Sequence, residues 1–188
     1  MTSQNTDEEI AAQVQRGARE LFGTLVERYE QKLLRYGRKF LSNGEDVADL
    51  VQTIFVKAYT NIQSFDPALR FSPWIYRIAH NAFVNELKRT SRAPAVSFDF
   101  DTVFPSLFAK ETADQSAQLR ETRTMLDASL AQIDVKYREP LVLHYFEDLE
   151  YQEIADILRI PVSTVGVRLA RGRALLRNVV ATHHHGRN

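Results

Sequence analysis

The sequence YQEIADILRIPVSTVGVRLAR, residues 151–171, holds the most specific local pattern in this chain. Its inward apolar positions recur at helical spacing in both halves: Ile154, Ala155 and Leu158, then Val165 and Leu169. Small Ala155 suits a close crossing by a second helix, and Pro161 cannot continue the first helix because it lacks the backbone N–H. The stretch therefore predicts two short helices joined by a tight turn, which is a helix-turn-helix.

The second helix of this pair leaves mostly polar and basic side chains on its outer face. They are Ser163, Thr164, Val167, Arg168, Arg171 and Arg173. In a helix-turn-helix the second helix lies in the major groove, where hydroxyls meet phosphates or base edges and arginine reaches guanine. We therefore expect this face to bind duplex DNA. An ordinary helical hairpin would show the same apolar spacing, and the one-sided run of arginines is what favours DNA.

The net charge of the whole chain argues at first against nucleic acid. The chain has 188 residues, with 24 Lys and Arg against 24 Asp and Glu, and phosphate contacts require surplus cation. The charge is unevenly distributed, however. Residues 139–156 hold six acids and no base, residues 157–188 hold six arginines and no acid, and residues 70–92 carry a surplus of four positive charges. Two basic regions are thus cancelled by acidic stretches, which face either solvent or a basic protein surface.

Composition excludes several classes of protein. The sequence has no cysteine, so disulfides, Cys-ligated zinc and a thiol nucleophile are excluded. No apolar run approaches the roughly 20 residues that span a bilayer, and the polar, acidic start MTSQNTDEEI is no signal peptide. We expect a cytoplasmic protein without membrane insertion. We also expect no cofactor and no metal site, because the adjacent histidines 183–185 do not converge on one ion.

Helical periodicity and the scarcity of glycine predict an all-α fold of two small helical domains joined by a flexible linker. The expected helices are 19–41, 46–60, 72–92, 116–131, 137–147, 151–158 and 162–178. The expected units are an N-terminal domain, an acidic linker that contains several Phe, a helix-turn-helix domain and a disordered tail, at residues 1–92, 93–119, 120–180 and 181–188.

The helix expected at 72–92 has a polar face opposite its apolar stripe. Arg77, Asn81, Asn85 and Lys88 share this face, and Phe65 and Trp74 lie near the helix start. Asparagine amides read base edges, lysine and arginine hold phosphate, and aromatic rings stack on unpaired bases. The face therefore indicates a single-strand binding surface, although a lone tryptophan at helical spacing is more often part of a core.

Taken together, these segments resemble an extracytoplasmic-function sigma factor of bacterial RNA polymerase, the compact type with only regions 2 and 4. Residues 46–59, DVADLVQTIFVKAY, resemble region 2.2, and residues 71–81, FSPWIYRIAHN, resemble regions 2.3–2.4. Residues 137–146, YREPLVLHYF, with the helix-turn-helix after them, resemble region 4. The sequence departs from the family pattern at Arg159, which stands where the turn often has glycine, and at Gly166, where a basic residue is frequent.

The resemblance implies a role for each surface. Region 2.2 would dock on the beta-prime coiled coil of core RNA polymerase through Asp49, Gln52, Thr53 and Val56. The minus-ten element would be read and melted by Phe65, Trp74, Arg77, Asn81, Asn85 and Lys88. The helix-turn-helix face would bind the minus-thirty-five element, and the surface around Tyr145, Phe146 and Leu149 would touch the beta flap. An anti-sigma factor is a further implied partner.

The function expected from sequence is thus an alternative sigma factor with no catalysis of its own. A self-sufficient helix-turn-helix regulator is the alternative; the base-stacking face of residues 72–92 argues against it, because a duplex-only regulator has no use for one. A hydrolase or phosphotransfer enzyme is disfavoured because the sequence has no Gly-rich phosphate loop, nucleophile elbow or metal-ligand helix pair.

Overall fold

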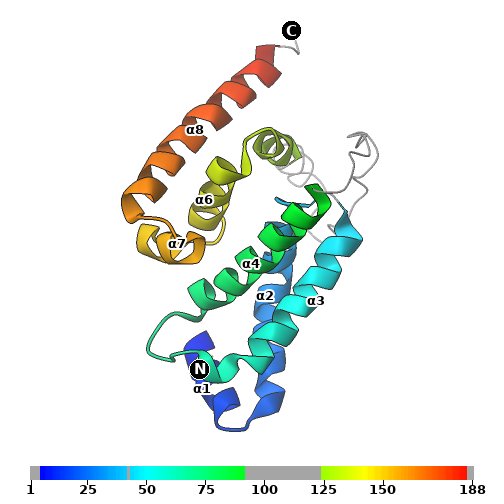
Figure 1. Cartoon of the computed structure of the whole chain (residues 1–188), viewed down its shortest axis with the longest axis vertical. Coiled ribbons are helices and arrows are strands. Elements are labelled where there is room, and N and C mark those ends of the chain that lie inside the picture. Colours follow the sequence, from blue (N-terminus) through cyan, green and yellow to red (C-terminus); the bar gives the residue numbers. More distant parts are fainter. Residues whose placement is uncertain (1–4, 42, 92–123, 186–188) are drawn as a thin grey trace, which may run out of the picture.

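The structure, a computed structural model, describes residues 5–41, 43–91 and 124–185. The predicted all-α class is confirmed, since no strand occurs in these ranges. Figure 1 shows α1–α4 as one group of helices and α6–α8 as a second group lying against α4. The linker expected at 93–119 lies outside the described residues.

Four helices form the N-terminal unit: α1 (Asp7–Gln15), α2 (Phe22–Gly37), α3 (Gly44–Thr60) and α4 (Phe71–Ser91). The short 3-10 helices η1 (Arg19–Leu21) and η2 (Ile62–Ser64) lie in the connections. Leu25, Leu33, Ile54, Ile75 and Phe83 are fully buried between the helices. The helices cross closely at Gly37, where an added Cβ would lie 2.5 Å from Cζ of Phe83.

Local chemistry explains where these helices begin. Asn43 caps α3, since its side chain accepts a hydrogen bond from the backbone N–H of Glu45, and α3 therefore starts two residues before the predicted position. The predicted helix 19–41 is divided into η1 and α2 and ends at Gly37. The helix α1, which the sequence did not predict, begins with a capping box between Thr6 and Glu9.

The C-terminal unit contains helical residues 124–131, α6 (Val135–Tyr145), α7 (Tyr151–Leu158) and α8 (Val162–His185). The helix-turn-helix core follows the prediction at Ile154, Ala155, Val165 and Leu169, which are buried. Leu158 is only half-buried, and the buried residue next to it is Ile157, which the apolar spacing did not single out. The helix α8 crosses α6 closely at Gly172, where an added Cβ would lie 2.9 Å from the carbonyl oxygen of Tyr137.

The helix α8 extends beyond its predicted end at residue 178. It runs to His185, so residues 181–185 of the expected disordered tail are helical. The reason is local, because no glycine or proline occurs between Gly172 and Gly186 to end the helix. Among the described helices, none is long and apolar enough to cross a membrane.

Candidate nucleic-acid interface

The turn between α7 and α8 is fixed by its own backbone. Arg159 adopts the left-handed conformation, with φ of 54°, at the position where glycine is common. The N–H of Ile160 then bonds to the carbonyl of Ala155, and the carbonyl of Pro161 accepts from the N–H groups of Thr164 and Val165. The turn therefore forms even though Arg159 stands where glycine is common.

The outer face of α8 is accessible. Ser163, Val167, Arg171 and Arg173 are exposed, and Thr164 and Arg168 are half-buried. The guanidinium of Arg173 donates to the hydroxyl of Tyr145 at 3.2 Å, so this side chain is positioned by α6. All six residues predicted for duplex binding thus lie on one helix whose opposite side packs in the core.

The polar face predicted on α4 is also accessible. Arg77, Asn81, Asn85 and Lys88 are all exposed and lie on one side of a continuous 21-residue helix. The opposite stripe, which includes Ile75, Ala79 and Phe83, is fully buried. The structure therefore brings these four side chains together as one surface.

The two aromatic residues predicted for base stacking differ from this group. Phe65 is only 3% exposed, and its ring packs on Phe71 and Trp74 with centroid separations of 5.3 and 5.4 Å. Trp74 is half-buried. In this structure the ring of Phe65 belongs to the core and supports Trp74 from within, so only Trp74 presents aromatic surface at the start of α4.

The third predicted surface lies on α3. Asp49, Gln52, Thr53 and Val56 are all exposed, with Val56 63% exposed, and the hydroxyl of Thr53 donates to the carbonyl of Asp49. Nearby residues of the same helix, Val47, Val51 and Ile54, are buried. Single exposed apolar side chains are normal on protein surfaces, so the structure shows here that the four side chains are accessible together on α3.

Sequence reasoning missed a polar contact between the two units, centred on Glu139 of α6. This residue is 5% exposed. Its carboxylate accepts a 2.5 Å hydrogen bond from the hydroxyl of Tyr36 and lies 2.6 Å from Nδ1 of His80. Burial first, and then the charge of Glu139, raise the pKa of the Tyr36 phenol, so the hydroxyl stays protonated and keeps donating.

Further polar pairs surround this centre. The hydroxyl of Tyr76 donates to Glu147, Lys39 pairs with Asp127, and Arg70 contacts both carboxylate oxygens of Glu153 at 2.9 Å. The other oxygen of Glu147 is buried without a hydrogen-bond partner among the described residues. Burial raises the pKa of the Glu147 carboxyl above its usual range, while the bond from Tyr76 partly opposes the shift.

These contacts explain part of the acidic stretch 139–156. Three of its six acids, Glu139, Glu147 and Glu153, face α2 and α4 or the residue before α4. The partner surface expected for these acids is therefore within the chain itself. The opposite charges of residues 70–92 and 139–156 were the available sequence signal, but charge alone does not identify which residues pair.

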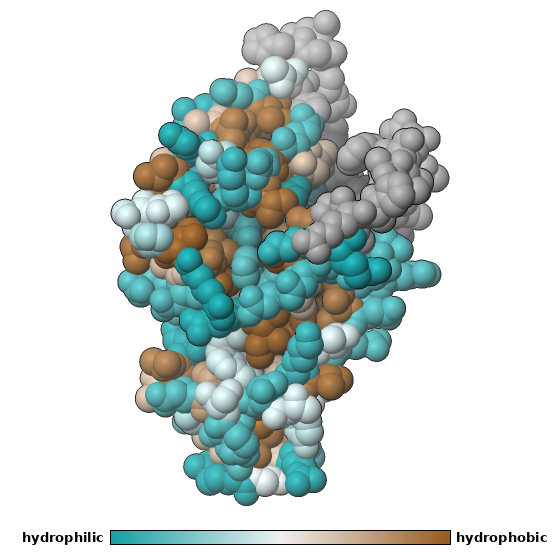
Figure 2. All heavy atoms as spheres, in the orientation of Figure 1, coloured by the Kyte–Doolittle hydropathy of each residue, from teal (hydrophilic) through white to brown (hydrophobic). Residues whose placement is uncertain are grey.

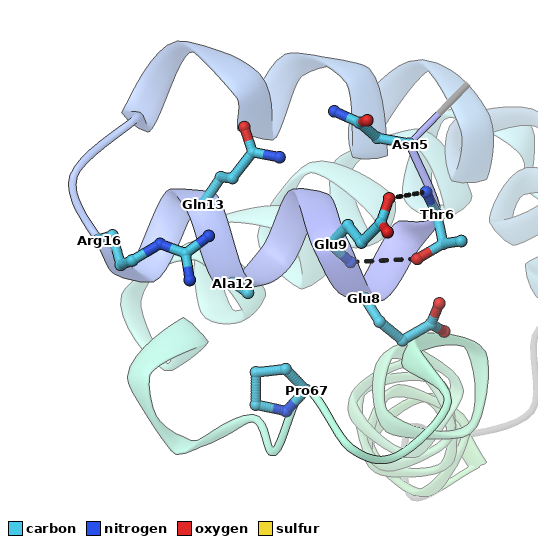
Figure 3. A pocket seen from close by; sticks show the side chains of 8 residues that line it. All are labelled: Asn5, Thr6, Glu8, Glu9, Ala12, Gln13, Arg16 and Pro67. Atoms are coloured by element: carbon cyan, nitrogen blue, oxygen red, sulfur yellow. Dashed lines mark hydrogen bonds between the residues drawn. The ribbon is translucent and has the colours of Figure 1, made fainter. Parts of the chain in front are cut away.

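Two further features of the described surface lie outside these faces. Tyr145 and Phe146 are 54% and 41% exposed, whereas Leu149, expected beside them, is buried. Figure 2 shows small apolar patches over both groups of helices, separated by polar side chains. A hollow between α1 and Pro67, shown in Figure 3, is lined mainly by polar groups. Within the described ranges, no cluster of three His, Asp or Glu residues could hold a metal ion.

Two segments of the chain match models of known protein families. Residues 25–93 match the family model for sigma-70 region 2, and residues 123–176 match that for sigma-70 region 4. The chain is 32% identical to the ECF RNA polymerase sigma factor SigW of Bacillus subtilis, over 88% of this chain and 91% of that protein. It is 33% identical to the ECF RNA polymerase sigma-E factor of Escherichia coli, over 96% and 97%.

Two solved structures share the architecture. CnrH, in complex with the cytosolic domain of CnrY, superposes with a TM-score of 0.70 at 28% identity, covering 95% of this chain and 99% of that one. The sigma factor RpoE of Bartonella quintana, in complex with the anti-sigma factor NepR, gives a TM-score of 0.69 at 19% identity, covering 85% and 96%. The second likeness concerns the fold alone.

Proposed function

This chain belongs to the ECF RNA polymerase sigma factors, and from that membership we propose how its surfaces divide the work of an alternative sigma factor. The face of α3 binds the beta-prime coiled coil of core polymerase. The face of α4 captures the melted minus-ten strand, and the face of α8 binds the minus-thirty-five duplex. The single observation that carries this proposal is that three separate polar faces are exposed on one chain, on three different helices.

The two DNA faces suit different forms of DNA. The outer face of α8 offers hydroxyls at its N-terminal end and then arginines, which is the arrangement of a recognition helix in a major groove. The face of α4 combines Asn81, Asn85 and Arg77 with the half-buried ring of Trp74. Asparagine amides and an aromatic surface bind the edges and planes of unpaired bases.

Reading both elements at once requires the two units to separate. Elements centred about 25 base pairs apart lie about 85 Å apart along a duplex that rises 3.4 Å per base pair. In this structure α4, the helix of the minus-ten face, contacts α7 of the helix-turn-helix directly. We therefore propose that the contact around Glu139 opens when the chain binds polymerase and promoter.

The proposal extends to partners and location. The structures of CnrH and of the Bartonella RpoE each contain a second protein. The protein bound to RpoE, NepR, is named an anti-sigma factor. An inhibitory partner that holds the two units is therefore part of our proposal. The chain acts in the cytoplasm, with polymerase and DNA, and contributes no catalytic step of its own.

Run-off transcription with purified core polymerase tests the proposed function. The wild-type chain should direct initiation from a cognate promoter and should bind that promoter weakly without core. Tight promoter binding by the chain alone, with no initiation by core, would instead identify a self-sufficient helix-turn-helix regulator.

Variants on the two DNA faces test the assignment of residues. Asn81→Ala combined with Lys88→Ala should impair promoter opening while core binding is unchanged. Arg168→Ala should weaken binding of the upstream element by about 1–3 kcal/mol. An unchanged open complex in the first variant would remove α4 from strand capture. Equal loss on every sequence in the second variant would make Arg168 a phosphate contact and not a base contact.

A further inference from the structure

The loop that leads into α4 is held at its beginning by Gln15, the last residue of α1. The side-chain amide of Gln15 donates to the carbonyls of Ile62 and Phe65, at 2.7 Å each. The side chain of Gln63 returns a 3.0 Å hydrogen bond to the carbonyl of Gln15. Three hydrogen bonds between segments almost 50 residues apart thus fix the chain at the point where the exposed part of the loop starts.

A second side chain of α1 holds the other end of the loop. The carboxylate of Glu8 accepts a 2.8 Å hydrogen bond from the backbone N–H of Phe71, the first residue of α4. That N–H is one of the donors that a helix start leaves unsatisfied, and a negative charge there is favoured by the helix dipole. Gln15 and Glu8 together therefore fix both ends of residues 66–70.

The residues between these two ends are exposed, and Arg70 among them pairs with Glu153 of α7, a contact that is lost when the two units separate. All five, Asp66 to Arg70, are exposed, and Leu69 is 63% exposed. The loop makes a local turn, in which the side chain of Asp66 accepts from the N–H of Ala68 and its carbonyl accepts from that of Leu69. Beneath Pro67 is the open hollow of Figure 3, so side-chain packing on α1 does not hold the middle of the loop.

The loop held in this way lies next to the base-binding face proposed for α4. Residues 66–70 run directly into the helix whose exposed face carries Arg77 and Asn81, and Trp74 lies one turn into that helix. An exposed apolar side chain such as Leu69, next to a base-binding face, can be inserted beside an unstacked base. It does so productively only if the backbone that carries it is held in place, because flexible loops lose affinity to ordering on binding.

We propose that Gln15 and Glu8 are positioning residues for capture of the melted strand, acting through the conformation of residues 66–70. The proposal rests on the function proposed above for the face of α4. It assigns this role to α1, a helix that lies before the segment matching sigma-70 region 2. Neither residue needs to touch DNA, since both act on the backbone of the loop.

The test replaces the donor amide with side chains of similar shape. Gln15→Met removes both donors, and Gln15→Glu places carboxylate oxygens opposite two carbonyl oxygens. The affinity of the chain with core polymerase for a single-stranded minus-ten oligonucleotide should fall about 5- to 13-fold for Gln15→Met, which corresponds to the roughly 1–1.5 kcal/mol that lost hydrogen bonds of this kind contribute. Gln15→Glu should lose more. The matched control is Gln13→Met, on the same helix.

A second pair of variants tests the other end. The bond from Phe71 needs only an acceptor, so Glu8→Gln should retain most of the strand affinity, whereas Glu8→Leu should lose it. Affinity for core polymerase and for a minus-thirty-five duplex should be unchanged in all these variants. A damaged fold would move those two measurements as well.

Three outcomes would overturn the proposal. They are unchanged strand affinity in Gln15→Met, equal losses in Gln15→Met and Gln13→Met, and a parallel loss of core and duplex binding that marks a purely structural role. Failure of the proposed function is distinguishable, because the wild-type chain itself would then not direct initiation. If the wild-type chain initiates and Gln15→Met captures the strand normally, only the positioning role is wrong.

Discussion

The helix α6 makes two contacts of opposite character. Toward α8 it packs through apolar surface, with Leu141 against Gly172 at a crossing so close that an added Cβ would lie 3.0 Å from Cδ1 of Leu141. Toward α2 and α4 it presents Glu139, which joins Tyr36 and His80 through short polar contacts. One helix thus combines a contact within its own unit with a contact between units.

The difference indicates which of the two contacts of α6 costs less free energy to open. Apolar surface exposed by separating α6 from α8 would cost free energy in proportion to its area. Polar groups exposed by separating α6 from α4 would instead form hydrogen bonds with water, so the net free energy of each bond is small. A chain that must hold its helix-turn-helix together and still release it from α4 needs both kinds of contact.

The largest expected effect comes from filling the close crossings. Gly172→Ala should lower the free energy of unfolding by about 1–3 kcal/mol, because the carbonyl of Tyr137 cannot move away from the new methyl group. Gly37→Ala should do the same in the N-terminal unit, where the ring of Phe83 and the side chain of Val47 lie still closer. Chemical denaturation measures both changes.

Gly166→Ala is the matched control, since its Cβ would meet only Tyr151, at 3.8 Å. Alanine there should stabilise α8 by up to about 1 kcal/mol through helix propensity. Destabilisation by Gly166→Ala, or stability gained in Gly172→Ala, would contradict the account of the close crossing.

The next effect concerns the contact between units. Glu139→Ala leaves the buried hydroxyl of Tyr36 without its acceptor, at a cost of about 1–3 kcal/mol to the closed arrangement. We expect spin labels on α3 and α8 to move apart while the helical content measured by circular dichroism is unchanged. Adding Tyr36→Phe should recover part of the loss, because the unsatisfied hydroxyl is then absent. If Glu139→Ala unfolds a unit instead, the contact is not separable.

The parts of the fold that sequence predicted are those set by local chemistry. Pro161 and the apolar spacing of residues 151–171 predicted the helix-turn-helix, and the exposed face of α4 followed from helical periodicity alone. The capping box of Thr6 and Glu9 would have indicated α1, but only three buried residues, Ile10, Ala11 and Val14, support the helical pattern there.

The parts that sequence could not give depend on distance in space. Tyr36 and Glu139 are 103 residues apart, and neither residue type signals its partner. Phe65 shows the same limit, because an aromatic residue that stacks on bases and one that packs on Phe71 have the same appearance in sequence. Acids of residues 139–156 contact α4 in the structure, whereas the sequence predicted that they face a basic protein surface or solvent.

A smaller effect is expected from Glu147, and it depends on pH. Burial raises the folded-state pKa of this carboxyl, so the folded chain binds its proton more tightly than the unfolded chain does. The stabilising contribution of that proton is complete below the ordinary glutamate pKa, about 4.3, and is lost as pH rises through the raised value. Glu147→Gln, which is neutral at every pH, should therefore remove this loss and be more stable than wild type at neutral pH.

Thermal unfolding at a series of pH values checks the prediction for Glu147. The difference between Glu147→Gln and wild type should be smallest in acid and should grow as the wild-type carboxyl ionises. Tyr76→Phe is a useful companion, since it removes the only hydrogen bond to Glu147 in the described structure and should enlarge the difference between the two Glu147 forms. A difference that is constant with pH would show that ionisation of Glu147 does not limit stability.

The smallest expected effect is at the edge of the contact, where Arg70 pairs with Glu153. The side chain of Arg70 is 53% exposed, so water and salt screen the pair, and Arg70→Ala should weaken the closed arrangement by less than about 1 kcal/mol. Glu153 is a poor site for this test because its carboxylate also accepts the N–H of Glu150 at the start of α7. Spin-label distances should show a slightly larger separated population in Arg70→Ala at low salt and no difference from wild type near 0.5 M salt, where the Debye length is about 4 Å.

The control for Arg70 is Arg77→Ala, which removes an exposed arginine on the polar face of α4 and should leave the spin-label distances unchanged. An effect of Arg70→Ala that salt does not reduce would mean that this pair, like Glu139, is shielded from water, and the contrast between a water-exchangeable edge and a buried centre would be lost.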